Sequence, residues 1–395
     1  MTSPSTKPSA AVAATVGLLA LASAMGIGRF SLTPILPLMQ HDRGLTFAAG
    51  AWLATGNYLG YLVGALACMA FAPRPVSAIR WGLIGVAVFT VAMGLSHSPL
   101  LWLALRFFAG AASALVLVGV SAWAMPILAR SGKERWSGWV FAGVGIGIAF
   151  AGLVGLAAGL DAWGSGATWI VMGAVAVALA LPLWRPLASD GVVTDRTEPK
   201  AQAMPRRTLV VAACYGLFGY GYIIPATFLP ALARGYIDDP AVFGWVWPVF
   251  GAAAALSTIA AARFGQGLPP ARLWMGAQWV LVAGLLAPVI SLNLATLLIA
   301  AIGVGGTFMV ITMAGIKEVL RVGGPKASRG IGMMTAAFSV GQIAGPLTVS
   351  AFAGSGNAFT VASVIAALAL VVGNVVLWAS GPRQDRGMSP EVAKN

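Results

Sequence analysis

The sequence predicts an all-α integral membrane protein with twelve transmembrane helices, arranged as two pseudo-symmetric halves of six. Apolar residues make up 59% of the 395 residues and charged residues only 9%, against roughly 25% charged residues in a typical soluble domain. Apolar runs of about 18 residues or more, which are long enough to cross a bilayer as a helix, recur along the whole chain. This composition excludes an ordinary soluble protein.

An internal repeat supplies the two halves. Gly26 and Gly28 recur at one constant displacement as Gly219 and Gly221. The same displacement relates a further set of residues, in which Leu36, Pro37 and Gly110 recur as Leu229, Pro230 and Gly303. Helical membrane proteins built from paired halves commonly bind a substrate between the halves and rock one half against the other. The repeat therefore indicates a transporter.

Each predicted span is justified by an apolar run bounded by polar or turn-forming residues. The expected spans, in chain order, are 10–39, 45–72, 76–95, 98–129, 136–160, 166–185, 207–235, 240–265, 270–290, 293–321, 327–354 and 358–379. A polar segment separates the sixth span from the seventh, so we expect an N-terminal half over 1–185, a cytoplasmic linker over 186–206 and a C-terminal half over 207–395. The stretch Ala22–Ala24 also fits a signal-peptide cleavage site, but cleavage there would remove the first span and break the symmetry.

The distribution of basic residues sets the expected orientation. The net charge is +13, and every Lys and Arg except Arg29, Arg43, Arg106 and Arg234 lies in the N-terminus, in the C-terminal tail or beside the loops that follow even-numbered spans. Cytoplasmic loops are enriched in Lys and Arg, so both termini are expected in the cytoplasm. The basic charge is explained by this topology, and nucleic acid is not an expected partner.

The sequence gives no sign of cofactor, metal or nucleotide chemistry. The two cysteines lie inside apolar spans, the two histidines fall in separate short loops, and no cluster with metal-ligand spacing exists. No phosphate-binding loop with its lysine is present. Paired mid-span aspartates, or Ser with His or Lys, would be needed for an intramembrane protease, and neither occurs. We therefore expect no enzyme activity, no cofactor and no metal site.

Glycines and prolines mark expected packing and gating positions. Small residues four apart let helices approach closely in lipid, and proline bends a helix because it lacks an N–H donor. Since the fifth and eleventh spans are repeat-equivalent, their glycines are interpreted as sliding surfaces between the halves, with simple packing as the alternative. The gating or packing residues are Gly26, Gly28, Pro34, Pro37, Gly110, Gly143, Gly147, Gly219, Gly221, Pro230, Gly341 and Gly345.

Four windows narrow the class of protein further. They are Gly26-Ile27-Gly28-Arg29-Phe30, Arg106-Phe107-Phe108-Ala109-Gly110, Phe141 to Gly147, and Gly305-Gly306-Thr307-Phe308-Met309. With two six-span halves, the chain resembles the major facilitator superfamily, and within it the bacterial YbfB/YjiJ-like transporters. The resemblance implies a secondary transporter of the bacterial inner membrane that works by alternating access. One departure is that the superfamily's Gly-x-Leu-Ala-Asp signature after span two ends here in Cys68, without the Asp.

Two arginines lie inside predicted spans. A charge in the membrane interior costs at least ~2.5 kcal/mol on insertion scales, so Arg29 and Arg106 are functional candidates by default. No Asp or Glu lies mid-span to pair with them. Two guanidinium groups facing water would favour an anionic substrate, whereas backbone carbonyls near Pro34 would make an arginine structural. The resemblance implies that the Arg106 position takes part in proton coupling in some relatives.

Aromatic and polar residues complete the expected substrate-binding or coupling set. They are Phe30, Asn57, Tyr58, Tyr222, Trp245, Thr307 and Gln342, of which Tyr222 is the repeat counterpart of Arg29. Expected partners are a small-molecule substrate, the lipid bilayer and protons as a candidate coupling ion, and the protein is expected to be a monomer. A small organic solute, with anions favoured, is the leading substrate. Efflux of varied hydrophobic compounds is the alternative within transport, and a non-transporting sensor or scaffold is the alternative outside it.

Overall fold

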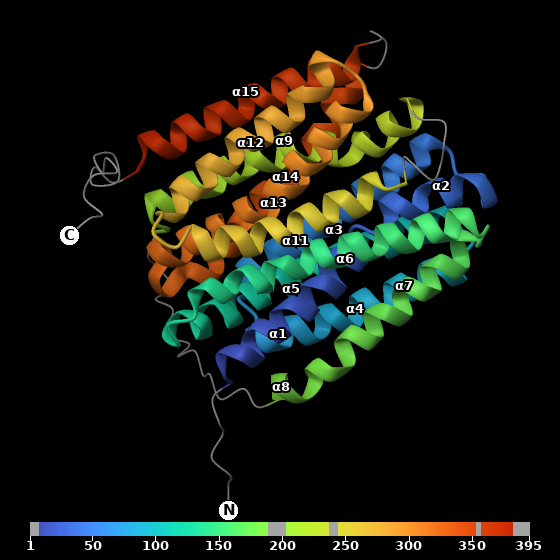
Figure 1. Ribbon diagram of the computed structural model, residues 1–395. Coiled ribbons are helices and arrows are strands. Elements are labelled where there is room, and N and C mark those ends of the chain that lie inside the picture. Colours follow the sequence, from blue (N-terminus) through green and yellow to red (C-terminus); the bar gives the residue numbers. More distant parts are fainter. Residues whose placement is uncertain (1–7, 189–202, 237–243, 353–356, 382–395) are drawn as a thin grey trace, which may run out of the picture.

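In the computed structural model, described over residues 8–188, 203–236, 244–352 and 357–381, long helices form a single bundle (Figure 1). The predicted linker lies largely outside these residues, as do the ends of the chain. In chain order the main helices are α1 (Ala10–Leu21), α2 (Leu32–Asp42), α3 (Phe47–Phe71), α4 (Pro75–Leu95), α5 (Pro99–Arg130), α6 (Ser137–Leu160), α7 (Ser165–Ala180), α8 (Trp184–Ala188), α9 (Arg206–Tyr236), α11 (Val246–Phe264), α12 (Pro270–Ile290), α13 (Leu294–Gly323), α14 (Ala327–Ala351) and α15 (Ala358–Ala379).

Within the described ranges, eleven helical segments are long and apolar enough to cross a membrane. The helix α14 is also long enough, and it corresponds to the predicted eleventh span. Polar side chains fix several helix starts: Thr46 Oγ1 accepts a hydrogen bond from Ala49 N at 3.1 Å, and Asn293 and Thr296 form a reciprocal capping box. Apart from the first span, the spans begin and end within several residues of their predicted positions.

The first span differs from its prediction. We expected one span over 10–39 with proline bends at Pro34 and Pro37, but the helix is already interrupted before them, where α1 gives way to the π-helical segment η1 (Ala22–Ile27) and a turn before α2 begins. In this segment Gly28 N bonds to Ser23 O and Phe30 N to Met25 O, each five residues back. The wider turn leaves backbone carbonyls without helical partners, and such bulges are frequent at functional sites.

The same neighbours recur in the two halves of the bundle. In the first half, α3 packs on α5, α1 and η1 on α6, and α4 on both α5 and α7. In the second half the repeat-equivalent pairs are α11 with α13, α9 with α14, and α12 with both α13 and α15. The blue-to-green and yellow-to-red helices lie on opposite sides of the bundle, with α6 and α11 adjacent between them (Figure 1).

Most of the contact between the halves comes from two helix pairs, α6 with α11 and α3 with α14. We call the end of the bundle that holds Arg130, Arg207 and Arg321 the basic end, and the other end the cavity end. A Cβ built on Gly332 of α14 would lie 3.2 Å from Met69 N of α3, and one built on Gly138 of α6 would lie 2.6 Å from Ala262 Cβ of α11. The halves therefore touch closely near the basic end.

Candidate functional site

Arg106 holds the broken first span together. Its side chain is fully buried in α5, and it donates from Nη1 to Gly28 O and from Nη2 to Arg29 O, each at 2.8 Å. Both carbonyls belong to the turn that follows η1. The guanidinium also lies 5.6 Å from the ring centroid of Trp169 in α7. Both terminal nitrogens of Arg106 are thus bonded to backbone acceptors, and only its buried Nε lacks a partner among the described residues. This arrangement does not support the expectation that Arg106 faces water and binds an anion together with Arg29.

Arg29 has a different environment, although it is only 3% exposed. Its Nη2 donates to Oε1 of Gln342, which lies on α14 in the other half. Its Cζ lies 3.8 Å from the centroid of the Tyr61 ring and 5.7 Å from that of Tyr58. Aromatic faces attract a cation but do not neutralise it. Arg29 is therefore a buried charge with aromatic neighbours and one neutral acceptor.

Several buried polar atoms around Arg29 have no hydrogen-bond partner among the described residues. They are Nε and Nη1 of Arg29, Nε2 of Gln342, and the hydroxyls of Tyr61 and Tyr222. Tyr222 stacks on Phe308 at 5.0 Å and lies 6.0 Å from Phe338, which itself lies 6.0 Å from the Arg29 guanidinium. An unsatisfied buried polar group costs about 1–3 kcal/mol, so several in one place mark a site that a ligand or water can complete. We call Arg29, Tyr61, Tyr222 and Gln342 the Arg29 cluster.

A cavity of about 840 Å³ lies between the halves on the cavity side of this cluster. Its described walls come from α2, α3 and α6 of the first half and from α9, α11, α14 and the start of α15 in the second. Most of the wall is apolar, with Leu32, Pro34 and Leu156 among its residues, and no described wall residue is Lys, Arg, Asp or Glu. The volume falls in the range of about 300–1,000 Å³ that is usual for small-molecule sites.

The floor of the cavity separates it from the Arg29 cluster. Tyr58 lines the cavity, and its ring also faces the Arg29 guanidinium. Trp247 lines the cavity too; it lies 6.3 Å from the ring of Phe30 and stacks on Phe250 at 5.0 Å, and its buried Nε1 has no described partner. We call Tyr58 and Trp247 the floor of the cavity, and of the two it is Tyr58 whose ring faces the Arg29 guanidinium.

Three of the predicted site residues have other roles. Asn57 donates from Nδ2 to Arg106 O at 3.0 Å and so joins α3 to α5. The Thr307 hydroxyl bonds within its own helix to Gly303 O at 2.6 Å. Trp245 is 52% exposed and lies outside the described cavity wall. The structure thus brings Arg29, Phe30, Tyr58, Tyr222 and Gln342 together and leaves these three apart.

Two further aromatic residues of the predicted second and eighth spans also lie at the site. Tyr61 and Trp247 both touch the site, as cluster member and as floor respectively. Tyr61 follows Tyr58 by three positions in a helix, a spacing that puts both rings on one face. No spacing signal in the sequence distinguishes Trp247 from Trp245. Only the structure shows that Trp247 is buried and lines the cavity.

The predicted glycines pack closely, but within the halves. A Cβ on Gly143 would lie 2.1 Å from Leu18 O, one on Gly26 would lie 2.4 Å from Gly147 Cα, and one on Gly341 would lie 2.1 Å from Gly216 O. The remaining contacts follow the same rule: Gly110 meets Asn57, Gly219 meets Phe338, Gly345 meets Ile223, Gly221 meets Leu370 and Gly28 meets Val86. For Gly143, Gly147, Gly341 and Gly345 these contacts favour simple packing over the alternative of sliding surfaces between the halves.

The interface between the halves uses other glycines. Gly145 and Gly152, which alternate with Gly143 and Gly147 along α6, face Gly251 and Pro248 of α11. One face of α6, with Gly143 and Gly147, therefore packs inside the first half. Another face, with Gly145 and Gly152, packs against α11 of the second half. Among the prolines, Pro34 and Pro37 line the cavity. Pro230 lies within α9, and its side chain is outside the described residues.

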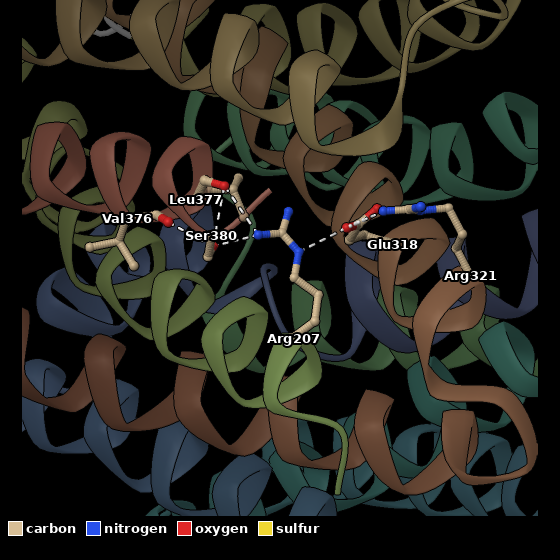
Figure 2. Close-up of polar contacts among 6 residues, drawn as sticks. All are labelled: Arg207, Glu318, Arg321, Val376, Leu377 and Ser380. Atoms are coloured by element: carbon tan, nitrogen blue, oxygen red, sulfur yellow. Dashed lines mark hydrogen bonds and ion pairs between the residues drawn. The ribbon is translucent and has the colours of Figure 1, made fainter. Parts of the chain in front are cut away.

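A second charged cluster lies at the basic end (Figure 2). Glu318 of α13 is fully buried and forms ion pairs with Arg207 of α9 at 3.1 Å and with Arg321 at 2.9 Å. Arg207 also donates to Leu377 O at 3.1 Å and to Ser380 Oγ. These contacts tie three helices of the second half together, and none of their residues lines the cavity.

The paired neighbours, the cavity between two six-helix groups and the charge at its floor define a membrane transporter. Residues 21–378 match the family described as "Uncharacterised MFS-type transporter YbfB", and the chain belongs to this family of the major facilitator superfamily. The predicted fold class and family are confirmed. The chain is also 26% identical over 267 residues to the "Uncharacterized MFS-type transporter YceJ" of Bacillus subtilis (strain 168). That match covers 62% of this chain and 64% of the relative, which is less than two thirds of the relative's length.

Proposed function

We propose that this transporter carries a small organic monocarboxylate with an apolar body, by alternating access. The observation that carries the proposal is one incompletely bonded guanidinium, that of Arg29, beneath an apolar cavity of about 840 Å³. Arginine pairs with a carboxylate through two parallel hydrogen bonds. Each such fork of Arg29 combines Nη2, which bonds to Gln342, with either Nε or Nη1, and neither of these two nitrogens has a partner among the described residues. Because Arg106 is committed to backbone carbonyls, one negative charge is the expected charge of the substrate.

The positive-inside bias supports placing the basic end in the cytoplasm. The cavity then faces outward, and the close contacts of Gly332 with Met69 and of Gly138 with Ala262 close the cytoplasmic side. Transport in this proposal opens both of these contacts at the basic end while the cavity end closes. The site itself lies at the junction of the halves, as is usual for carriers with repeated halves.

The apolar wall favours one alternative, a carrier that exports neutral or cationic hydrophobic compounds. Such compounds would use the aliphatic wall and the aromatic floor without using Arg29. The buried Arg29 would then be a structural charge bonded only to Gln342. A sensor or scaffold would bind ligand without moving it.

Binding and transport of simple acids distinguish these functions. We expect benzoate and octanoate to raise the unfolding temperature of the purified protein, and radiolabelled benzoate to enter proteoliposomes. Stabilisation at ~100 times the dissociation constant amounts to about 2.7 kcal/mol. Both effects are expected to vanish in Arg29→Ala and to persist in Arg263→Ala, because Arg263 is exposed on α11 away from the cavity.

Other results would assign a different function. Equal benzoate binding by wild type and Arg29→Ala would overturn charge recognition at Arg29. Stabilisation by tetraphenylphosphonium but by neither acid would favour the exporter. Binding of benzoate without any uptake or exchange in proteoliposomes would favour the sensor.

A further inference from the structure

Gln342 provides a polar link between the halves at the level of the proposed site. It lies on α14 of the second half and is fully buried, and its Oε1 accepts a hydrogen bond from Arg29 of the first half. Its amide nitrogen, by contrast, has no described partner. A glutamine placed only to stabilise the bundle would be expected to use both of its polar atoms, as the buried Gln278 does. Gln278 accepts from Trp274 Nε1 and donates to Leu370 O, both at 2.7 Å.

The Gln342 amide oxygen occupies a position suited to an anion. It meets a guanidinium that is buried, carries a full charge and is otherwise surrounded by aromatic rings. A neutral amide oxygen is a weaker acceptor for this group than a carboxylate, because a carboxylate adds the attraction between two opposite charges and can accept two parallel hydrogen bonds from one guanidinium. A carboxylate arriving from the cavity would therefore compete with Gln342 for Arg29.

We propose that Gln342 is an internal placeholder for the substrate carboxylate, so that substrate binding breaks the Arg29–Gln342 link between the halves. This inference rests on the proposed function and deepens it. In the empty carrier, Gln342 holds Arg29 and keeps α14 beside the first span. In the loaded carrier, the carboxylate takes Arg29 Nη2 together with one of the free nitrogens, and the Gln342 side chain is released. Substrate binding thereby breaks a hydrogen bond, Arg29–Gln342, that joins the two halves and that must change when one half moves against the other.

Two substitutions at this one position are expected to act in opposite directions. Gln342→Met keeps the length of the side chain but removes the competing oxygen, so benzoate should bind more tightly by about tenfold, given a net worth of ~1.5 kcal/mol for a hydrogen bond to a charged group. Gln342→Glu supplies a tethered carboxylate. It should raise the unfolding temperature of the ligand-free protein and weaken benzoate binding by at least about a hundredfold.

Gln278→Met is the matched control, because it removes another fully buried glutamine from the second half. It is expected to lower the unfolding temperature and to leave the dissociation constant of benzoate within about twofold. The measurements are titrations of benzoate against the purified proteins, followed by intrinsic tryptophan fluorescence, alongside thermal unfolding without ligand.

The outcome separates the placeholder from the proposed function. If Arg29→Ala abolishes benzoate binding but Gln342→Met also weakens it, then Gln342 contributes to substrate binding and the placeholder is wrong while the function stands. If Gln342→Glu binds benzoate as tightly as wild type, the placeholder is wrong as well. If Arg29→Ala binds benzoate normally, both proposals fail together.

Discussion

Arg29 and Arg106 are the same type of residue in the same membrane interior, yet the fold treats them differently. Arg106 is fully buried and donates two hydrogen bonds of 2.8 Å to consecutive backbone carbonyls. Arg29 is also buried but bonds only to the side chain of Gln342, and two of its nitrogens remain without described partners. The two arginines are therefore alike in burial and differ in their hydrogen-bond partners, which are two backbone carbonyls for Arg106 and one neutral side chain for Arg29.

The reason lies in the backbone of the first span. The π-helical segment η1 shifts the hydrogen bonds by one residue, so the carbonyls of Gly28 and Arg29 become available outside the helix. Arg106 reaches them from α5 and completes the break. The side chain of Arg29 extends from the same break toward the other half, where side chains rather than backbone meet it. The same irregular turn thus supplies the backbone carbonyls to which Arg106 donates and sets the position of the Arg29 side chain.

Removing Arg106 should have the largest effect on stability. Arg106→Ala leaves Gly28 O and Arg29 O buried without donors, and each such group costs about 1–3 kcal/mol. We expect a loss of roughly 2–5 kcal/mol in the free energy of unfolding, measured by thermal or denaturant unfolding in detergent. Arg29→Ala, in contrast, should lose less stability than Arg106→Ala, because it leaves one buried acceptor, Gln342 Oε1, without a donor and also removes a buried charge that has only a neutral partner.

Arg106→Lys tests whether charge or geometry matters. Lysine keeps the charge but cannot reproduce the fixed fork of the guanidinium, so we expect stability between those of wild type and Arg106→Ala. Wild-type stability in Arg106→Ala would contradict the comparison, because it would mean that the break in the first span holds without this residue.

A smaller loss is expected at Ser113, the second group of α5 that meets the break. Its hydroxyl lies 2.8 Å from both Ala24 O and Ala109 O. Side-chain hydrogen bonds between membrane helices are worth about 0.6 kcal/mol on average, so Ser113→Ala should lower the free energy of unfolding by about that amount. Ser121→Ala is the matched control in the same helix, because the buried Ser121 hydroxyl has no described partner. Equal losses in the two variants would show that the Ala24 contact carries no stability.

The number, order and approximate ends of the spans could be predicted because they depend on apolar length and composition, which are local properties. Gln342 and Tyr222 could be placed near the site because polar residues inside apolar spans are costly and few. The hydrogen bonds from Arg106 to backbone carbonyls could not be predicted, since they depend on a π-helical turn that no local sequence pattern in 22–31 indicates. The side of α6 that faces α11 could not be predicted either. Gly143, Gly145 and Gly147 are all glycines in sequence, and only their packing partners in the structure differ.

The two tryptophans at the start of α11 give the most specific test, because only Trp247 lines the cavity. Trp247 is 4% exposed and forms part of the cavity floor, whereas Trp245 is half exposed and lies outside the described wall. A buried aromatic contact at a binding site commonly contributes ~1 kcal/mol or more. Trp247→Ala should therefore weaken benzoate binding about fivefold or more, and the conservative Trp247→Phe should weaken it less.

Trp245→Ala should leave the dissociation constant within about twofold, because that side chain does not contact the cavity. Titration of benzoate against the purified variants, followed by isothermal calorimetry because tryptophan fluorescence itself is altered, measures all three. A loss in Trp245→Ala equal to that in Trp247→Ala would place the substrate away from the floor. The route from the cavity to Arg29 would then have to pass elsewhere, and the distinction between a binding Arg29 and a structural Arg106 would rest on Gln342 alone.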